Sequence, residues 1–205
     1  MNETHIAPKL QSICVYCGSG TGRSAAFAEA ARSLGRILAA SRIGLVYGGG
    51  SLGLMGEIAR SVLDHGGHIT GIIPGFLGER ERMLTEAQEL IVVEDMHQRK
   101  QLMFAKSDAF VALPGGLGTL EEFVEQLTWS QLGRHTRPIV LANIEGFFDP
   151  LLVQFDSMVT EGFIRPGLDL NLIVVERVED IVPAIEGALG PTSTQRVEAD
   201  VAAKF

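Results

Sequence analysis

A glycine-rich turn that runs into an acidic helix is the segment of this sequence best suited to chemistry. Residues 109–113 are apolar and predict a buried strand, which Pro114 ends because proline cannot donate a hydrogen bond to a neighbouring strand. The glycines within residues 115–118 allow a tight turn and let a ligand approach the backbone closely. A helical pattern begins at Thr119, and the free N–H groups of a helix start favour an anion by roughly 0.3–1 kcal/mol. The segment therefore predicts a phosphate site, with Glu122 beside it as the reacting residue.

Two adjacent glutamates, Glu121 and Glu122, lie near the start of this expected helix. Successive residues of a helix point about 100° apart, so only one of the two is expected to face the ligand. Acidic residues in a first turn also stabilise a helix through its dipole, which is an ordinary structural explanation for both.

A pair of cations, Arg99 and Lys100, begins another expected helix, residues 96–106, which Asp95 is expected to cap. One interpretation is that both are solvated surface charges, as adjacent cations usually are. However, cations near a helix start oppose its dipole. Binding of an anion, or stabilisation of developing charge, is therefore the functional alternative, and the local pattern leaves both open.

A second glycine-rich turn, Gly48, Gly49 and Gly50, follows an expected strand. With Gly53 it matches the spacing of a dinucleotide fingerprint, but an NAD site also needs an acid near the end of the next strand. The next strand ends at residues 71–74 without an acid, so NAD binding is not expected. Three successive glycines exceed what a turn requires, which favours a ligand contact over tight packing alone.

The two cysteines, Cys14 and Cys17, are spaced as C-x-x-C. They lie along an expected strand, where residues three apart point to opposite faces, so buried thiols are expected rather than redox chemistry. The five histidines have no ligand spacing with one another or with the cysteines. We therefore expect no bound metal.

Strands and helices are expected to alternate along the whole chain. Parallel strands need crossover helices, so the fold class is α/β, Rossmann-like and doubly wound, with a mainly parallel sheet and helices on both faces. Ligands of such sheets bind beyond the carboxyl ends of the strands, and three of these ends are glycine-rich: 18–22, 48–53 and 115–118. The expected strands are 12–17, 43–47, 68–73, 90–93, 108–113, 138–142 and 172–175, and the expected helices are 24–40, 54–65, 96–106, 119–132, 149–161 and 178–189. Residues 74–87 are expected to be irregular, residues 1–190 to form a single domain, and residues 191–205 to form a flexible tail.

The composition suits a compact globular protein. Of 205 residues, 46% are hydrophobic and 20% are charged, which argues against disorder. The net charge of −8 weighs against a general nucleic-acid binder, so a phosphorylated substrate would be held by local donors. No signal peptide and no membrane-spanning apolar run is expected, which favours a cytoplasmic location.

Two longer motifs identify a family resemblance. Residues 114–122 resemble the P-G-G-x-G-T-x-x-E signature of the LOG ("Lonely guy") family, the cytokinin riboside 5′-monophosphate phosphoribohydrolases, and residues 95–100 resemble its M-H-x-R-K segment. Residues 17–19, 48–56 and 128–133 also match family positions. The similarity covers the chain except the first ten residues and the tail after Leu189.

The resemblance implies a homodimer that hydrolyses the N-glycosidic bond of an N6-modified AMP, releasing a free cytokinin base and ribose 5-phosphate without a cofactor. It implies that Arg99 and Glu122 are the catalytic pair. The substrate contacts that it implies are Glu81, Arg99, Lys100, Gly115, Gly116, Leu117, Gly118, Thr119, Leu120, Glu121 and Thr128. Further nucleotide contacts are expected at Ser19, Gly48, Gly49 and Gly50.

The chemistry implied by the resemblance suits these residues, but the sequence leaves the role of Glu122 open. Breaking the C1′–N bond builds positive charge on the ribose. The Glu122 carboxylate could stabilise this charge, hold the ribose hydroxyls or activate water. Leu117 occupies a position where many members have tyrosine, so it and residues 74–87 are expected to influence base preference. A broader AMP or purine nucleotide nucleosidase is the alternative. A non-catalytic carrier, similar to molybdenum-cofactor carrier proteins, would not need the Arg99–Glu122 pair.

Overall fold

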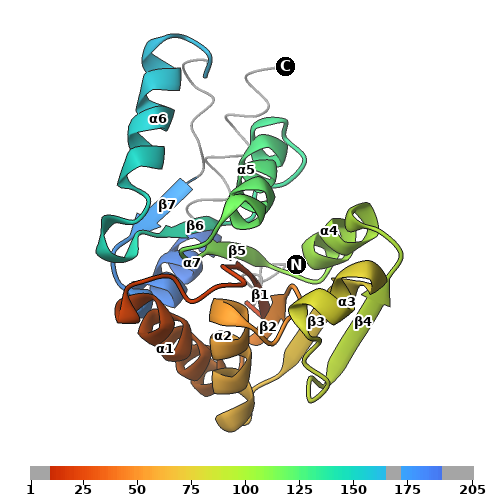
Figure 1. Ribbon diagram of the computed structural model, residues 1–205. Helices are drawn as coiled ribbons and strands as arrows, with labels where there is room; N and C mark the ends of the chain where they lie inside the picture. Colours follow the sequence, from red (N-terminus) through yellow and green to blue (C-terminus); the bar gives the residue numbers. More distant parts are fainter. Residues whose placement is uncertain (1–9, 165–171, 191–205) are drawn as a thin grey trace, which may run out of the picture.

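The fold is built on one parallel sheet of seven strands (Figure 1). It is seen in a computed structural model that describes residues 10–164 and 172–190, without the side chains of 79–81. The strand order is β4-β3-β2-β1-β5-β6-β7, so the order reverses at β1 and the sheet is doubly wound, as expected. The strands are β1 Ser12–Tyr16, β2 Gly44–Tyr47, β3 Ile69–Pro74, β4 Glu89–Val93, β5 Ala109–Ala112, β6 Ile139–Ala142 and β7 Leu172–Val175.

Helices cover both faces of the sheet. The helices are α1 Ala25–Ser41, α2 Gly53–Asp64, α3 Gly75–Glu81, α4 Met96–Ala105, α5 Leu117–Gln131, α6 Asp149–Thr160 and α7 Ile181–Leu189, with short 3₁₀ turns η1 Ile144–Gly146 and η2 Val178–Asp180. One apolar core lies under α1, α2 and α7, and a second lies under α4, α5 and α6. Alternate residues of β1 supply both cores: Ile13 points into the first and Cys14 into the second. This two-layer burial explains why the strands read as continuous apolar runs.

Side-chain caps begin two of the helices, and one of the two caps was expected. The Ser24 hydroxyl accepts a hydrogen bond from Ala26 N at 3.2 Å at the start of α1. The Asp95 carboxylate accepts one from Gln98 N at 2.8 Å at the start of α4. These caps satisfy N–H groups that have no partner within the helix. The predicted cap of α4 is therefore confirmed, and with it the position of Arg99 one turn into the helix.

The expectation of an irregular segment over residues 74–87 is wrong for its first half. Pro74 ends β3, and α3 follows over Gly75–Glu81. Pro74 provides no side-chain cap, and Phe76, the first large apolar residue of α3, is 65% exposed. The helix therefore lacks both signals from which a sequence predicts one, a capping residue and a buried apolar stripe. The expected tail over residues 191–205 lies outside the described residues.

Both cysteines are free and buried, as expected. Cys14 lies in the core under α4 to α6 and Cys17 in the core under α1, α2 and α7, so they face opposite sides of β1. Burial raises the pKa of both thiols well above the ordinary range. Neither thiol is therefore a nucleophile at neutral pH. No helix within the described ranges is long and apolar enough to cross a membrane.

Candidate active site

The three glycine-rich loops meet beyond the carboxyl ends of the strands. Gly18 N donates to Pro114 O at 3.1 Å, and Leu54 N donates to Gly18 O at 3.0 Å. A Cβ on Gly53, where φ is +57°, would overlap the backbone of Ser19. The loops therefore pack backbone against backbone, which requires glycine at these contacts.

A cavity of about 210 Å³ opens between these loops and the start of α4. Its lining includes residues 116–119 at the start of α5, together with Gly48 and Met55. The α5 helix begins after Gly116 with no side-chain cap. Its first N–H groups therefore have no side-chain acceptor, which is the arrangement that the predicted anion site requires. Residues predicted for the site that line this cavity are Ser19, Gly48, Arg99, Gly116, Leu117, Gly118, Thr119 and Glu122.

A buried ion pair lies in this cavity. Arg99 of α4 and Glu122 of α5 are joined at 2.8 Å between Nη1 and Oε1, and their side chains are only 8% and 10% exposed. Charges held out of water interact more strongly than charges at the surface. They are costly to bury unless paired, so their presence beside an open helix start indicates a functional site.

The Arg99 side chain is also anchored to the sheet. Its Nε donates to the carbonyl of Ile72, in β3, at 3.2 Å. Nη1 lies 4.0 Å from the Met96 sulfur, one turn earlier in α4. Arg99 therefore reaches from α4 across the end of β3, with its guanidinium directed at Glu122.

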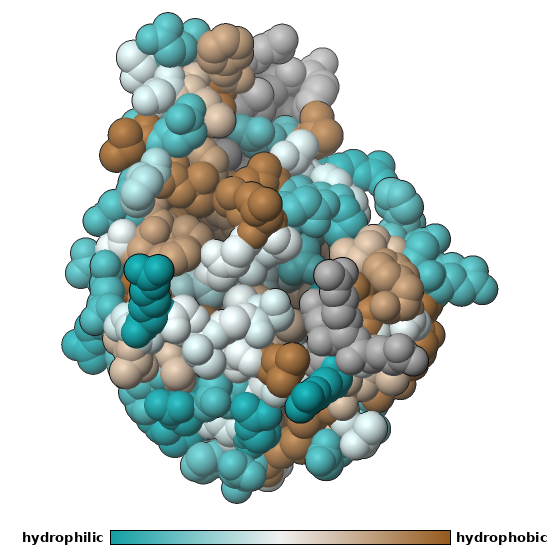
Figure 2. Space-filling model, in the orientation of Figure 1, coloured by the Kyte–Doolittle hydropathy of each residue, from teal (hydrophilic) through white to brown (hydrophobic). Residues whose placement is uncertain are grey.

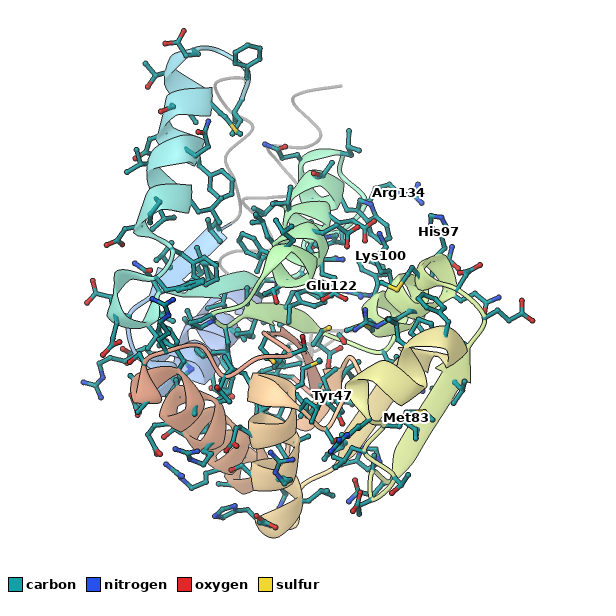
Figure 3. The ribbon with its side chains drawn as sticks, in the orientation of Figure 1. Tyr47, Met83, His97, Lys100, Glu122 and Arg134 are labelled. Atoms are coloured by element: carbon teal, nitrogen blue, oxygen red, sulfur yellow. The ribbon has the colours of Figure 1, made fainter. Side chains whose placement is uncertain are left out.

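The neighbouring charges make a second, more open connection between the same helices. Lys100 Nζ lies 2.7 Å from Glu121 Oε1 and 2.9 Å from Glu125 Oε1. Figure 3 shows Lys100 and Glu122 on the facing sides of α4 and α5. Partial burial acts to lower the pKa of Lys100, but its hydrogen bonds to the two glutamates outweigh burial and raise that pKa overall. Glu122 lines the cavity and Glu121 does not, as the angle between adjacent helical residues requires.

Comparison with known proteins gives this arrangement a family. A family profile described as "Possible lysine decarboxylase" matches residues 55–185. A probable cytokinin riboside 5′-monophosphate phosphoribohydrolase of Oryza sativa subsp. japonica is 52% identical over 80% of this chain and 72% of its own. A cytokinin riboside 5′-monophosphate phosphoribohydrolase of Arabidopsis thaliana is 46% identical over 88% of each chain. This chain belongs to the LOG family.

A solved structure with much lower sequence identity shares the fold. The molybdenum cofactor binding protein of Rippkaea orientalis is 20% identical, with a TM-score of 0.67 over 89% of this chain and 99% of its own. At this identity the likeness concerns the fold alone. The doubly wound sheet is thus common to the LOG family and to this binding protein.

Several positions expected from the LOG resemblance lie away from the cavity. Thr128 donates to Val124 O at 2.8 Å within α5, and Lys100 and Glu121 contact each other. Leu120 is also absent from the lining. The side chain of Glu81 lies outside the described residues.

The glycines of the 48–50 segment also differ in their surroundings. Gly48 lines the cavity, whereas Gly49 has a φ of +77° and a Cβ there would lie 3.1 Å from Ile73 Cβ. Gly50 forms an isolated bridge with Met83. Only the first of the three therefore faces the candidate active site.

A second cavity, of about 310 Å³, adjoins the first and was not expected from the sequence. The two share Gly18, Ser19 and Gly116. Phe27 of α1 and Phe147, which precedes α6, give the second cavity an aromatic side, with ring centroids 5.5 Å apart at 76°. Gly115, an expected substrate contact, lines this cavity, and a Cβ there would overlap the Thr119 hydroxyl.

Two polar residues near the site also escaped the sequence analysis. Tyr16 lines the first cavity, and burial raises the pKa of its hydroxyl well above the ordinary value. Glu125 holds Lys100, while its Oε2 is buried without a hydrogen-bond partner among the described residues. Glu125 follows Glu122 at helical spacing, which is the only sequence signal that points to it. In the part of the chain that the structure describes, no cluster of histidine, cysteine, aspartate or glutamate is able to hold a metal ion.

Proposed function

We propose that this protein hydrolyses the N-glycosidic bond of a cytokinin riboside 5′-monophosphate, an N6-modified AMP. Relatives 52% and 46% identical to the chain bear that activity in their names. The observation that carries the proposal is the buried Arg99–Glu122 pair, which lies in one cavity with the uncapped start of α5. An anion-binding helix start beside a buried carboxylate suits a nucleotide whose ribose is to be cleaved.

The reaction adds water across the C1′–N9 bond. The base leaves with a hydrogen on N9, and the hydroxyl group of the water is added to C1′, which gives ribose 5-phosphate. Positive charge develops on the ribose as the bond breaks, and the carboxylate of Glu122, whose side chain is only 10% exposed, stabilises it. Arg99 holds that carboxylate in place and offers its guanidinium to the substrate.

The phosphate is proposed to lie at the start of α5. There the N–H groups of residues 117–119 have no side-chain acceptor, and the helix dipole favours negative charge. Such local donors are needed because the protein itself carries a net charge of −8. The remaining proposed contacts are Glu81, Lys100, Gly115, Leu120, Glu121 and Thr128, with Ser19 and Gly48 beside them.

We also propose a cytoplasmic homodimer in which residues 1–190 act as one domain. Figure 2 shows apolar residues among polar ones on the face that carries α5 and α6. Val124 of α5 and Val153 and Val159 of α6 are 37%, 64% and 50% exposed. Exposed apolar side chains on two helices that cover the same face of the sheet are suited to a contact with a second copy. Light scattering is expected to give twice the chain mass of 22.1 kDa.

Base release tests the proposed function. Purified protein is incubated with isopentenyl-AMP and, separately, with AMP, and the free base is separated by chromatography. Faster release from isopentenyl-AMP supports the proposal. Faster release from AMP supports the broader purine nucleotide nucleosidase. Release from neither substrate contradicts both.

A further inference from the structure

One nitrogen of the Arg99 guanidinium is left facing the cavity. Nε is occupied by the Ile72 carbonyl at 3.2 Å, and Nη1 by Glu122 at 2.8 Å. Nη2 has no hydrogen-bond acceptor among the residues that the structure describes, and Arg99 lines the cavity. Arginine carries its donors in a fixed fork, so holding two nitrogens directs the third. Nη2 is therefore the guanidinium nitrogen that these two contacts leave available.

Gly48 provides the space that Nη2 occupies. A Cβ at this position would overlap Nη2, and it would lie 3.4 Å from Arg99 Cζ and 3.1 Å from Met55 Sδ. Gly48 is not among the glycines with positive φ, so another residue can adopt its backbone conformation. The requirement for glycine here is consequently one of space at the guanidinium and not of turn geometry.

We propose that Gly48 is a positioning residue for the hydrolysis, which acts by letting Arg99 present Nη2 to the nucleotide. The proposal rests on the proposed function. Since Nε and Nη1 are anchored, a side chain at position 48 cannot be accommodated by Nη2 alone: the whole planar group has to tilt, at the expense of the Ile72 or the Glu122 contact. An alanine at position 48 thus misplaces the buried pair without removing either of its charges.

The first experiment compares two alanine substitutions, one at the residue that follows β2 and one at the first residue of β2. Gly48→Ala is expected to lower kcat/KM for base release about 100-fold, as a displacement near 1 Å at a reacting group does. Gly44→Ala is the matched control, because a Cβ there meets only ordinary contacts, 3.6 Å from Gln11 O and 3.8 Å from Ser12 Cβ. Its activity is expected to equal that of the wild type. A Gly48→Ala variant as active as the control overturns the proposal.

A double-mutant cycle then separates positioning from a general structural role. Lysine at position 99 has no Nη2, so it leaves room for an alanine at 48. Gly48→Ala is therefore expected to change the rate less than about threefold when Arg99→Lys is already present. If Gly48→Ala costs the same factor in both backgrounds, it acts independently of Arg99 and the proposal is wrong.

Unfolding in urea keeps this test separate from the proposed function. If the wild type releases no base from any nucleotide, the proposed function fails, but the steric coupling is still measurable. Gly48→Ala is expected to lower the urea midpoint clearly when Arg99 is present, and to have a smaller effect when lysine replaces it. Equal effects in the two backgrounds overturn the inference, whatever the activity.

Discussion

Two connections between α4 and α5 are made by adjacent residues and differ in their surroundings. Arg99 and Glu122 are 8% and 10% exposed, whereas Lys100 and Glu121 are 15% and 53% exposed. A step of one residue on each helix turns the side chains by about 100°, which moves the second pair out of the cavity. A cation and a carboxylate thus form the proposed reactive centre in one place and a more exposed interhelical ion pair, called the tether below, in the other. Both pairs join a cation to a carboxylate, and they differ in how far their charges are removed from water.

Breaking the buried connection is expected to have the largest effect on stability. Arg99→Met removes the cation that lies 2.8 Å from the buried carboxylate of Glu122, which is expected to lower the free energy of unfolding by about 3 kcal/mol. Urea unfolding measures this loss. The double variant Arg99→Met/Glu122→Met removes both charges and should be more stable than the single variant, although neither should release base. A single variant as stable as the wild type contradicts this view of the pair.

Breaking the tether is expected to have a smaller effect. Lys100→Met removes the cation from Glu125, whose Oε2 has no hydrogen-bond partner in the part of the chain that the structure describes, and a loss of about 1 kcal/mol is expected. Lys100→Arg keeps the charge and serves as the control. If Lys100→Met destabilised the protein more than Arg99→Met does, the expectation that the buried pair contributes more to stability would be wrong.

The pH dependence of the tether has a defined sign. The pKa of Lys100 is raised in the folded protein, because its hydrogen bonds to Glu121 and Glu125 outweigh partial burial. Its contribution to stability is therefore complete below the unfolded pKa of about 10.4 and is lost as the pH rises through the higher folded pKa. The difference in urea midpoint between wild type and Lys100→Met should be constant from neutral pH to about pH 9 and shrink above pH 10. A difference that grows with alkaline pH would show that Lys100 is not held by the two acids.

Much of the fold could be predicted because its signals are local. The apolar runs of the strands, the Asp95 cap and the glycines after β1, β2 and β5 are each visible within a few residues. Arg99 and Glu122 were expected from motifs, and the prediction that one of two adjacent glutamates faces the ligand follows from helix geometry alone.

What the sequence could not show depends on distances between elements. The anchoring of Arg99 to the Ile72 carbonyl, and the space that Gly48 leaves for it, join residues of α4, of β3 and of the loop after β2. The aromatic cavity brings Phe27 together with Phe147, 120 residues later. The α3 helix has neither cap nor buried stripe, so no local pattern marks it.

The most direct test of the difference between the two glutamates is a pair of kinetic measurements on Glu122→Gln and Glu121→Gln, with the binding of AMP followed by calorimetry. We expect Glu122→Gln to lower kcat for base release by about 10²–10³ while AMP binding changes little, because the lost charge acts mainly in the transition state. Glu121→Gln should keep kcat and change KM by no more than about fivefold, as expected for an exposed contact. A collapse of kcat in Glu121→Gln, with Glu122→Gln still active, would contradict the assignment of the chemistry to the buried pair.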